Sequence, residues 1–301
     1  MKNSSIVVVG SSNTDMVVLT DHLPAGGETV LGGEFFMNPG GKGANQAVAA
    51  SRLGGAVTFI AKIGNDIFGK QAVELLKKEG INTSYILEDP DHPSGIALIT
   101  VDRQGENCIV VASGSNANLR QGDIQKVKEI IQQAGIVLLQ LEIPQPSVEY
   151  VVQIAAAAGA KVILNPAPAR TLPDALLGRL SIITPNETET EILTGIKIKD
   201  EESAERAAIK LREKGVDTVI ITMGSRGAFV FNDDVCEMIP APAVQAIDTT
   251  AAGDVFNGAL SVALSENKSI YEAVFYACSA ASISVTRRGA QASAPFRNEI
   301  I

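Results

Sequence analysis

Short, continuously apolar runs rich in β-branched residues recur along the chain, and helix-like segments separate them. The runs are Ile6 to Val9, Thr58 to Ile63, Ile136 to Leu141, Val162 to Leu164, Ile182 to Thr184 and Thr218 to Thr222. An apolar run without alternation is typical of a strand covered on both faces, which occurs in parallel sheets. The sequence therefore predicts a doubly wound α/β fold, with a mainly parallel central sheet and helices on both faces.

Two of the intervening segments carry clear helix signals. The segment from Lys70 to Glu79 is amphipathic and stops at Gly80, whereas the segment from Glu201 to Lys214 follows Asp200, a good N-cap residue. Both are predicted to be helices that pack on the sheet.

Two stretches, Met16 to Met37 and Ser94 to Ala112, break this pattern because their apolar residues alternate around turn sequences such as Asp102-Arg-Gln-Gly. Alternation around a turn is typical of an antiparallel hairpin. Each stretch is too small to fold alone, so we expect the two to pair into one small sheet that stands off the main domain. Residues 1–301 are thus expected to form a single domain with inserted segments at about 16–37 and 94–112.

The charge balance disfavours whole classes of partner. With 25 Lys and Arg against 34 Asp and Glu, the formal net charge is −9, so the surface repels nucleic acids and anionic lipids. No apolar run approaches the roughly 18 residues of a membrane span. Three widely spaced cysteines indicate a reducing compartment. We therefore expect a cytoplasmic protein that binds neither nucleic acid nor membrane.

Only two histidines are present, so any catalysis must use carboxylates, Lys, Asn and backbone dipoles. The run from Pro39 to Gln46 precedes an Ala-rich segment, Ala47 to Leu53, that is predicted to be a helix. Its three glycines allow close approach of a ligand, and Lys42 and Asn45 offer side-chain donors. It is not a P-loop, because Gly43 stands where Ser or Thr is required. The alternative is a glycine-rich turn that caps a helix.

The run from Asp248 to Ala259 places a carboxylate, Asp254, at the start of a predicted helix from Val255 to Leu264. There the carboxylate can accept a proton, and the N–H groups of Ala252, Gly253 and Asp254 can hold phosphate charge. Phosphoryl transfer to an alcohol requires this combination. The alternative is a carboxylate that only caps the helix.

Four motifs together carry a family resemblance. They are Gly-Gly-Lys-Gly-Ala-Asn-Gln (residues 40–46), Asn-Pro-Ala-Pro-Ala-Arg (165–170), Thr-Pro-Asn-Glu-Thr-Glu (184–189) and Asp-Thr-Thr-Ala-Ala-Gly-Asp (248–254). In this order and spacing they resemble the PfkB/ribokinase family of carbohydrate kinases, and the resemblance covers essentially the whole chain. It implies ATP-dependent phosphorylation of D-ribose at the 5-hydroxyl, giving D-ribose 5-phosphate and ADP, with Mg²⁺ as phosphate counter-ion and activation by K⁺. It also implies that the small sheet closes over the sugar as a lid and joins two chains into a homodimer.

The resemblance further implies roles for individual residues. Asp254 would be the general base, beside an anion hole at Ala252 and Gly253. The sugar-binding residues would be Asn13, Asp15, Gly41, Lys42, Asn45, Glu142 and Asp254. The nucleotide would lie along Asn186, Thr222, Gly224, Ser225, Gly227, Gly253 and Cys278. Mg²⁺ and phosphate would be arranged by Asn186 and Glu189. K⁺ would be held, mostly through backbone oxygens, by Asp248, Thr250, Ser284, Arg287, Gly289 and Ser293.

Two departures and several alternatives accompany this interpretation. Val255 stands where the family commonly has Thr or Ser, and Cys278 where some members place a His near the adenine. Asn186 and Glu189 also fit a helix N-cap and its capping-box partner. The functional alternatives are a kinase for another sugar or a nucleoside, and a catalytically silent sugar or nucleotide sensor on the same fold. A dinucleotide-dependent oxidoreductase is excluded, because no strand is followed by the GxGxxG pattern.

Overall fold

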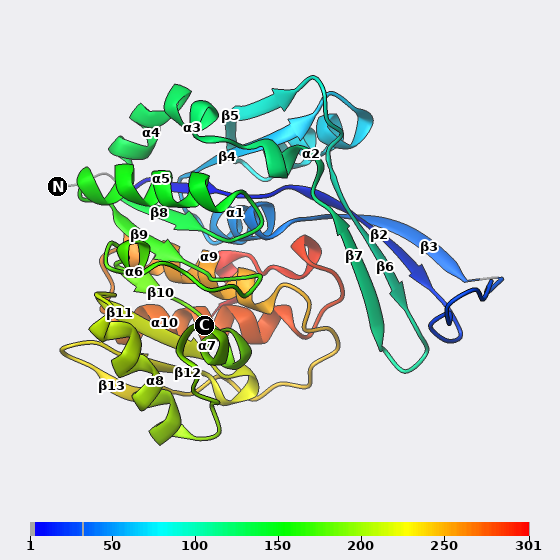
Figure 1. The fold of residues 1–301 in the computed structure, drawn as a ribbon. Helices are drawn as coiled ribbons and strands as arrows, with labels where there is room; N and C mark the ends of the chain where they lie inside the picture. Colours follow the sequence, from blue (N-terminus) through cyan, green and yellow to red (C-terminus); the bar gives the residue numbers. More distant parts are fainter. Residues whose placement is uncertain (1–3, 32, 301) are drawn as a thin grey trace.

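The computed structural model describes residues 4–31 and 33–300. A large sheet with helices on both faces forms the body, and a small sheet projects from it (Figure 1). The predicted α/β architecture is confirmed. No helix in the described ranges is both long enough and apolar enough to cross a membrane.

The large sheet has the strand order β13-β12-β11-β10-β9-β8-β1-β4-β5. Its strands are β1 (Ile6–Val9), β4 (Val57–Gly64), β5 (Asn82–Asp89), β8 (Ile136–Leu139), β9 (Lys161–Leu164), β10 (Ile182–Ile183), β11 (Thr218–Thr222), β12 (Ala228–Phe231) and β13 (Cys236–Ile239). All neighbouring strands from β11 through β1 to β5 in this order pair in parallel. Strands β12 and β13 add an antiparallel hairpin at one edge.

The helices cover both faces of this sheet (Figure 1). They are α1 (Lys42–Arg52), α2 (Ile67–Lys78), α3 (Gln121–Lys126), α4 (Lys128–Gln133), α5 (Gln145–Ala157), α6 (Asp174–Leu177), α7 (Glu187–Thr194), α8 (Glu201–Glu213), α9 (Ala252–Ser265) and α10 (Ile270–Ser284). Asp200 caps α8 as predicted, accepting from the N–H of Ser203. Helix α2 begins at Ile67, ahead of the predicted Lys70, because Asp66 caps it by accepting from Gly69.

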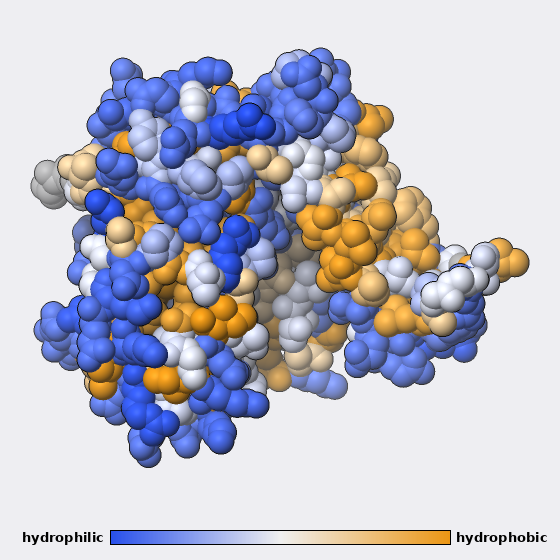
Figure 2. Space-filling model, viewed as in Figure 1, coloured by the Kyte–Doolittle hydropathy of each residue, from blue (hydrophilic) through white to orange (hydrophobic). Residues whose placement is uncertain are grey.

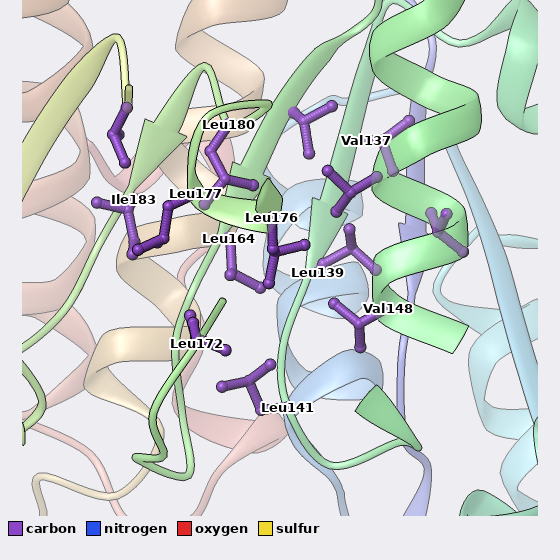
Figure 3. Close-up of a cluster of buried hydrophobic side chains, with 14 of the residues drawn as sticks. Val137, Leu139, Leu141, Val148, Leu164, Leu172, Leu176, Leu177, Leu180 and Ile183 are labelled. Atoms are coloured by element: carbon purple, nitrogen blue, oxygen red, sulfur yellow. The ribbon is translucent and has the colours of Figure 1, made fainter. Parts of the chain in front are cut away.

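The side chains of β1 alternate between two apolar clusters, one on each face of the sheet. Ile6 and Val8 join α1, α9 and α10, whereas Val7 and Val9 join α5, α6 and α8. Figure 3 shows part of the second cluster, where Leu139 on β8 lies among side chains of neighbouring strands and helices. This burial on both faces explains why the strands read as continuous apolar runs.

The small sheet has the order β3-β2-β6-β7. Its strands are β2 (Asn13–Leu19), β3 (Glu34–Gly40), β6 (Gly95–Val101) and β7 (Asn107–Ala112). Both hairpins are antiparallel as predicted, and a parallel pairing of β2 with β6 joins them. The first hairpin extends beyond the predicted 16–37 at both ends, so Asn13 and Asp15 lie on β2 at the base of the sheet; residue 32 lies outside the described residues.

The chain order of the large sheet reverses at β1, which lies between β8 and β4. In open α/β sheets such a switch point opens a crevice at the carboxyl ends of the strands. The segments that follow β1, β8, β9 and β10 meet here beside the base of the small sheet, and they carry the polar residues of the candidate site.

Candidate active site

Asp254 is the centre of the site. It lies in the first turn of α9, its residue is only 4% exposed, and both its oxygens accept side-chain hydrogen bonds. Asn45 Nδ2 lies 3.0 Å from Oδ2, and Gln46 Nε2 lies 3.0 Å from Oδ1. Burial raises the pKa of Asp254, although the charge of Lys42 and the two amide hydrogen bonds act to lower it. The carboxylate is thus a buried proton acceptor of raised basicity.

Helix α1 supplies three of the neighbours of Asp254. Lys42, Asn45 and Gln46 stand at positions i, i+3 and i+4, so they share one face of the helix. The helix approaches the chain after β1 very closely, since a Cβ at Gly43 would lie 2.6 Å from the Ser11 nitrogen. Gly41 has a φ of 89°, which favours glycine. Helix α1 begins at Lys42, earlier than the predicted Ala47, and this places Lys42 on the site-facing side.

The start of α9 is the turn for which anion binding was predicted, and it leaves N–H groups free. Ala251 is in the left-handed region with a φ of 59°, and the first helical bond runs from the Val255 N–H to the Ala251 carbonyl. The preceding N–H groups of Gly253 and Asp254 are therefore not used by the helix. The Ala252 N–H, by contrast, already donates to the Thr249 carbonyl over 3.3 Å. Gly253 is exposed, so its N–H is accessible to a ligand.

A second carboxylate, Glu142, follows β8. Its hydrogen bonds connect this segment to the segment after β1 and to the start of α1. Its Oε2 accepts from Ser11 Oγ at 2.5 Å and from the Lys42 N–H at 3.0 Å. Asp15 on β2 faces it: burial first, and then the charges of Glu142 and Asp254, raise the pKa of Asp15 to about 6. Lys42 lies among these carboxylates, and the charge of Asp254 is the main cause that raises its pKa.

Asn13 and Asn45 complete the predicted sugar-binding set with the carboxylates and Lys42. Asn13 Oδ1 accepts from Asn116 Nδ2 at 2.8 Å, which directs the Asn13 amide nitrogen away from Asn116. Asn45 Oδ1 is buried and has no hydrogen-bond partner among the described residues. A buried acceptor without a partner is costly, and a ligand hydroxyl would satisfy it.

Two cavities lie in this region, and Lys42 lines the smaller of them. The one on the side of the small sheet has a volume of about 370 Å³ and is lined by Asn13, Val111, Asn116, Leu141, Glu142 and Arg170, among others. The other, of about 210 Å³, is lined by Lys42, Asn165, Asn186, Glu189, Thr222 and the start of α9. The Lys42 N–H bond to Glu142 joins residues that line the two cavities. Asp254 lines the smaller cavity.

Asn186 and Glu189 form the capping box of α7. The Glu189 N–H donates to Asn186 Oδ1, and the Asn186 N–H donates to Glu189 Oε2, each over 2.8 Å. Both residues also line the smaller cavity, and burial is the main cause that raises the pKa of Glu189. Oxygen donors beside a phosphate-sized space suit Mg²⁺. Within residues 4–31 and 33–300 no group of three or more His, Cys, Asp or Glu could hold a metal.

Of the predicted nucleotide residues, Thr222 ends β11, and Gly224, Ser225 and Gly227 follow it along the chain. Thr222 bridges to Asn186 and lines the smaller cavity, and Gly224 and Ser225 are exposed just beyond it. Gly227 has a φ of 106°, and a Cβ there would lie 2.1 Å from the Ile239 oxygen. Cys278 differs, because it is 4% exposed in the apolar cluster around α10 and lines neither cavity.

Asp248 joins the two loops of the predicted K⁺ site. Its Oδ1 accepts from the Thr250 N–H and its Oδ2 from the Gly289 N–H, each over 2.9 Å. Burial acts to raise the pKa of Asp248, but these hydrogen bonds outweigh it and lower the pKa. The Arg287 side chain pairs with Glu299 instead, so only its backbone is available to this loop.

The Ser284 carbonyl accepts from the Arg287 N–H, and the buried Ser293 hydroxyl donates to the Ala290 carbonyl. Of the predicted K⁺ set, direct hydrogen bonds therefore connect Asp248 with Thr250 and Gly289, and Ser284 with Arg287. Ser293 is not bonded to the others.

Several buried amides in the site lie outside the predicted set. Among them are Gln46, Gln140 and Asn116, each less than 2% exposed. Gln140 directly follows the apolar strand β8, and Gln46 shares the helical face of Lys42. A polar residue at an otherwise apolar position is the sequence signal that could have identified these residues.

The chain is similar to known proteins over nearly its whole length. The sequence profile described as pfkB family carbohydrate kinase matches residues 3–297. A ribokinase of Haemophilus influenzae is 47% identical over 99% of this chain and 97% of its own. The crystal structure of a ribokinase from Thermotoga maritima is 40% identical, with a TM-score of 0.91 over 98% of this chain and 97% of that chain. An Arabidopsis thaliana ribokinase solved with ribose and ATP is 35% identical, with a TM-score of 0.91 over 100% and 98%.

The match to the family profile and the identity over nearly full lengths agree with the geometry around Asp254 and the start of α9. The chain belongs to the pfkB family of carbohydrate kinases.

Proposed function

We propose that the protein transfers the γ-phosphoryl group of ATP to the 5-hydroxyl of D-ribose. The observation that carries this proposal is the position of Asp254: a buried carboxylate that lines a polar cavity, with free helix N–H groups beside it. The similarity of the chain to ribokinases, one of them solved with ribose and ATP, favours ribose as the acceptor.

In the proposed reaction, Asp254 accepts the proton of the 5-hydroxyl as that oxygen attacks the γ-phosphorus. A new O–P bond forms, the bond between the γ-phosphorus and the β,γ-bridging oxygen breaks, and ADP leaves with the electron pair. The N–H groups of Gly253 and Asp254, and the Lys42 ammonium, stabilise the charge on the transferred group. The products are D-ribose 5-phosphate and ADP.

Polar groups in the larger cavity and beside it suit a sugar, which is rich in hydroxyls; of these, Asn13 and Glu142 line the cavity itself. The carboxylates of Asp15 and Glu142 accept hydroxyl hydrogens, the amide of Asn13 donates, and Asn45 Oδ1 gains the partner that it lacks. Gly41 lets the backbone approach closely. A sugar without a matching hydroxyl would leave buried groups unpaired, which explains selectivity.

Asn186 and Glu189 would arrange Mg²⁺ with the ATP phosphates, which, with water, would supply most of its ligands. Bound there, Mg²⁺ neutralises charge on the phosphates. Asp248 and the loops that it joins would hold K⁺, which maintains the turn before α9. We further propose that the nucleotide lies along Thr222 to Gly227 and Gly253, and that the three free thiols reflect a cytoplasmic location.

The projecting sheet, β2, β3, β6 and β7, is called the lid here, and we propose that it closes over the sugar and joins two chains. It carries exposed apolar side chains, including Phe35, Met37, Ile109 and Val110 (Figure 2). Exposed apolar surface of this kind favours contact with a second chain. The chain then acts as one domain with its lid as the dimer interface.

The experiment is a coupled assay of ADP release with ATP and Mg²⁺ and a panel of acceptors. D-ribose should give the highest kcat/KM, above 2-deoxyribose, other pentoses, hexoses and nucleosides. Nuclear magnetic resonance of the product should place the phosphate on the 5-oxygen. A higher kcat/KM for another acceptor would reassign the substrate, and binding without ADP release would indicate a sensor.

A further inference from the structure

Two buried glutamines form a chain of hydrogen bonds that ends on Asp254. Gln140 Nε2 donates to Gln46 Oε1 over 2.5 Å, and Gln46 Nε2 donates to Asp254 Oδ1 over 3.0 Å. Gln46 Nε2 also donates to Asn165 Oδ1 over 3.2 Å. Both glutamines are fully buried. The chain therefore connects the end of β8, through α1, to the first turn of α9.

The carboxylate sets the direction of every hydrogen bond in this chain. An ionised Asp254 can only accept, so Gln46 must turn its amide nitrogen toward it. The Gln46 carbonyl then faces the opposite way and needs a donor, which Gln140 supplies. If Gln46 turned over, its oxygen would face the Asp254 carboxylate, and the two acceptors would repel each other. Gln140 thus holds Gln46 in the one orientation that supports the carboxylate.

The two amides that bind Asp254 differ in what they have left for a ligand. Asn45 donates to Asp254 and keeps a buried oxygen without a partner, whereas the Gln46 amide uses its oxygen and both its N–H groups. Asn45 is therefore free to bind substrate, and Gln46 is not. This contrast separates a substrate-binding residue from one that serves the carboxylate alone.

Gln140 makes the fold less stable than an apolar side chain of similar size would. Its Oε1 is buried and has no partner among the described residues. A Cβ at Gly10 would lie 2.1 Å from that oxygen, so only glycine at position 10 leaves room for it. A buried amide with an unpaired oxygen is less favourable than an apolar side chain of similar size, and the fold alone does not require it.

We infer that Gln140 and Gln46 are positioning residues for the reaction, which hold the Asp254 carboxylate oriented and ionised without contacting either substrate. The inference rests on the proposed function, in which Asp254 is the base. Other charged groups that face Asp254 are Lys42 on α1, Glu142 after β8, Asp15 on β2 and Glu189 on α7. None of these is changed in the variants below.

The test uses Gln46→Met and Gln140→Met, with Gln140→Leu as a second variant at the inner position. Ser147→Ala is the matched control, since Ser147 is equally buried and its hydroxyl donates to the Leu119 carbonyl on another element. Asp254 is titrated by carbon-13 resonance of labelled aspartate carboxyls in the protein without substrates, with Asp254→Asn for assignment. kcat and KM are then measured from pH 5 to 9, with thermal unfolding of every variant.

Loss of a donor to a buried carboxylate favours its protonated form. In Gln46→Met the pKa of Asp254 should rise, because the Gln46 hydrogen bond acts to lower it, and the acid limb of kcat should move to higher pH with it. At pH 7 kcat should fall about 10- to 100-fold because the carboxylate is less well oriented, with KM for ribose changed less than about threefold. In both Gln140 variants the pKa of Asp254 should rise by less. Their Tm should stay close to that of the wild type, because the unpaired Gln140 oxygen is lost while Gln46 Oε1 loses its donor. Ser147→Ala should change Tm alone.

A wild-type pKa of Asp254 in both Gln140 variants would overturn the inference, as would a kcat that falls only in step with Tm. If the wild type releases no ADP with ribose, the proposed function fails instead. The titration of Asp254 needs no substrate, so it still decides whether the two glutamines control the carboxylate.

Discussion

At the scale of single residues, the site combines a well-bonded carboxylate with others that repel each other. Asp254 has an amide on each oxygen, whereas Asp15 is destabilised in its ionised form by burial and by two neighbouring carboxylates. The two amide hydrogen bonds stabilise the ionised form of Asp254, whereas ionised Asp15 needs hydrogen-bond donors to offset its burial and the neighbouring charges. Substitutions at the two positions should therefore have different effects.

Asp254→Asn should remove turnover and leave binding. The amide is nearly isosteric with the carboxylate but cannot accept the hydroxyl proton, and general-base catalysis contributes about 10²- to 10⁴-fold. We expect kcat to fall by that factor, whereas the Kd of ribose from calorimetry stays within about tenfold. A variant with near-normal kcat would show that another group takes the proton.

Asp15→Asn should stabilise the fold at neutral pH and weaken sugar use. The pKa of Asp15 is about 6 in the folded protein, against an ordinary value of 3.8. The folded state therefore binds this proton more tightly, and the stability of the wild type falls as pH rises from about 4 through about 6. The full shift corresponds to about 3 kcal/mol, which partial exposure reduces to roughly 1–2 kcal/mol. Tm should rise at pH 7 and not at pH 4, with a higher KM for ribose. Equal Tm changes at both pH values would refute the electrostatic cause.

At the scale of elements, the continuous apolar runs predicted the central strands well, because burial on both faces leaves a direct mark on the sequence. The edge strands β5 and β13 are partly exposed, so they lack that mark and were not predicted. The buried strand β12 was also missed, because its apolar run is only four residues long and directly follows the turn after β11. Helices α1 and α9 begin before their predicted starts because each first turn contains a glycine, Gly43 or Gly253, and glycine is unfavourable in a helix and typical of turns.

Sequence motifs likewise identified only part of the site. Motifs pointed to Lys42, Asn45, Asp254 and the carboxylates, which lie together. Gln140 was not identified, since its role depends on the contact with Gln46, 94 positions away along the chain.

Gly43→Ala should damage the element that carries Lys42, Asn45 and Gln46. The added Cβ would lie 2.6–2.7 Å from the backbone of Gly10 and Ser11, so α1 must move away from β1. We expect a Tm several degrees lower and a reduced kcat, since overpacking costs about 1–3 kcal/mol.

Gly122→Ala in α3 is the matched control, because its Cβ would meet nothing within 4 Å. It should leave kcat unchanged and stabilise the fold by up to about 1 kcal/mol. Equal effects of the two changes would contradict the close approach of α1.

At the scale of the whole molecule, loops from distant parts of the chain hold the turn before α9. Asp248 joins residue 250 to residue 289, and the Val285 carbonyl accepts from Ile247 and Asp248. The geometry of the anion-binding turn thus depends on the C-terminal segment as well as on α9.

Replacing K⁺ by Na⁺ or a bulky organic cation at constant ionic strength should lower kcat. Misaligned donors in an anion hole cost about 10²- to 10³-fold, which sets the upper limit of the loss. Asp248→Ala should be slow in K⁺ and respond little to the exchange. A wild-type rate that is the same in every cation would refute the K⁺ site.

Val110→Glu tests the lid as a dimer interface. Val110 is 61% exposed on β7, and a charge in the centre of an apolar contact is strongly unfavourable. Sedimentation velocity should show a dimer for the wild type and a monomer for the variant. Ile209→Glu, at an exposed apolar position on α8, should remain dimeric. A wild-type monomer would refute the interface.

The position of Asp15 on the lid has a consequence for the order of events. The carboxylate stands on β2, whereas the two that repel it, Glu142 and Asp254, belong to the body. In the proposed reaction, this repulsion would act between the two parts in the absence of sugar and would favour their separation, and sugar hydroxyls between the carboxylates would replace repulsion by attraction. Acceptor binding would then supply the energy that closes the entrance, so that a closed site without acceptor, in which water could receive the phosphoryl group, would be the least favourable state.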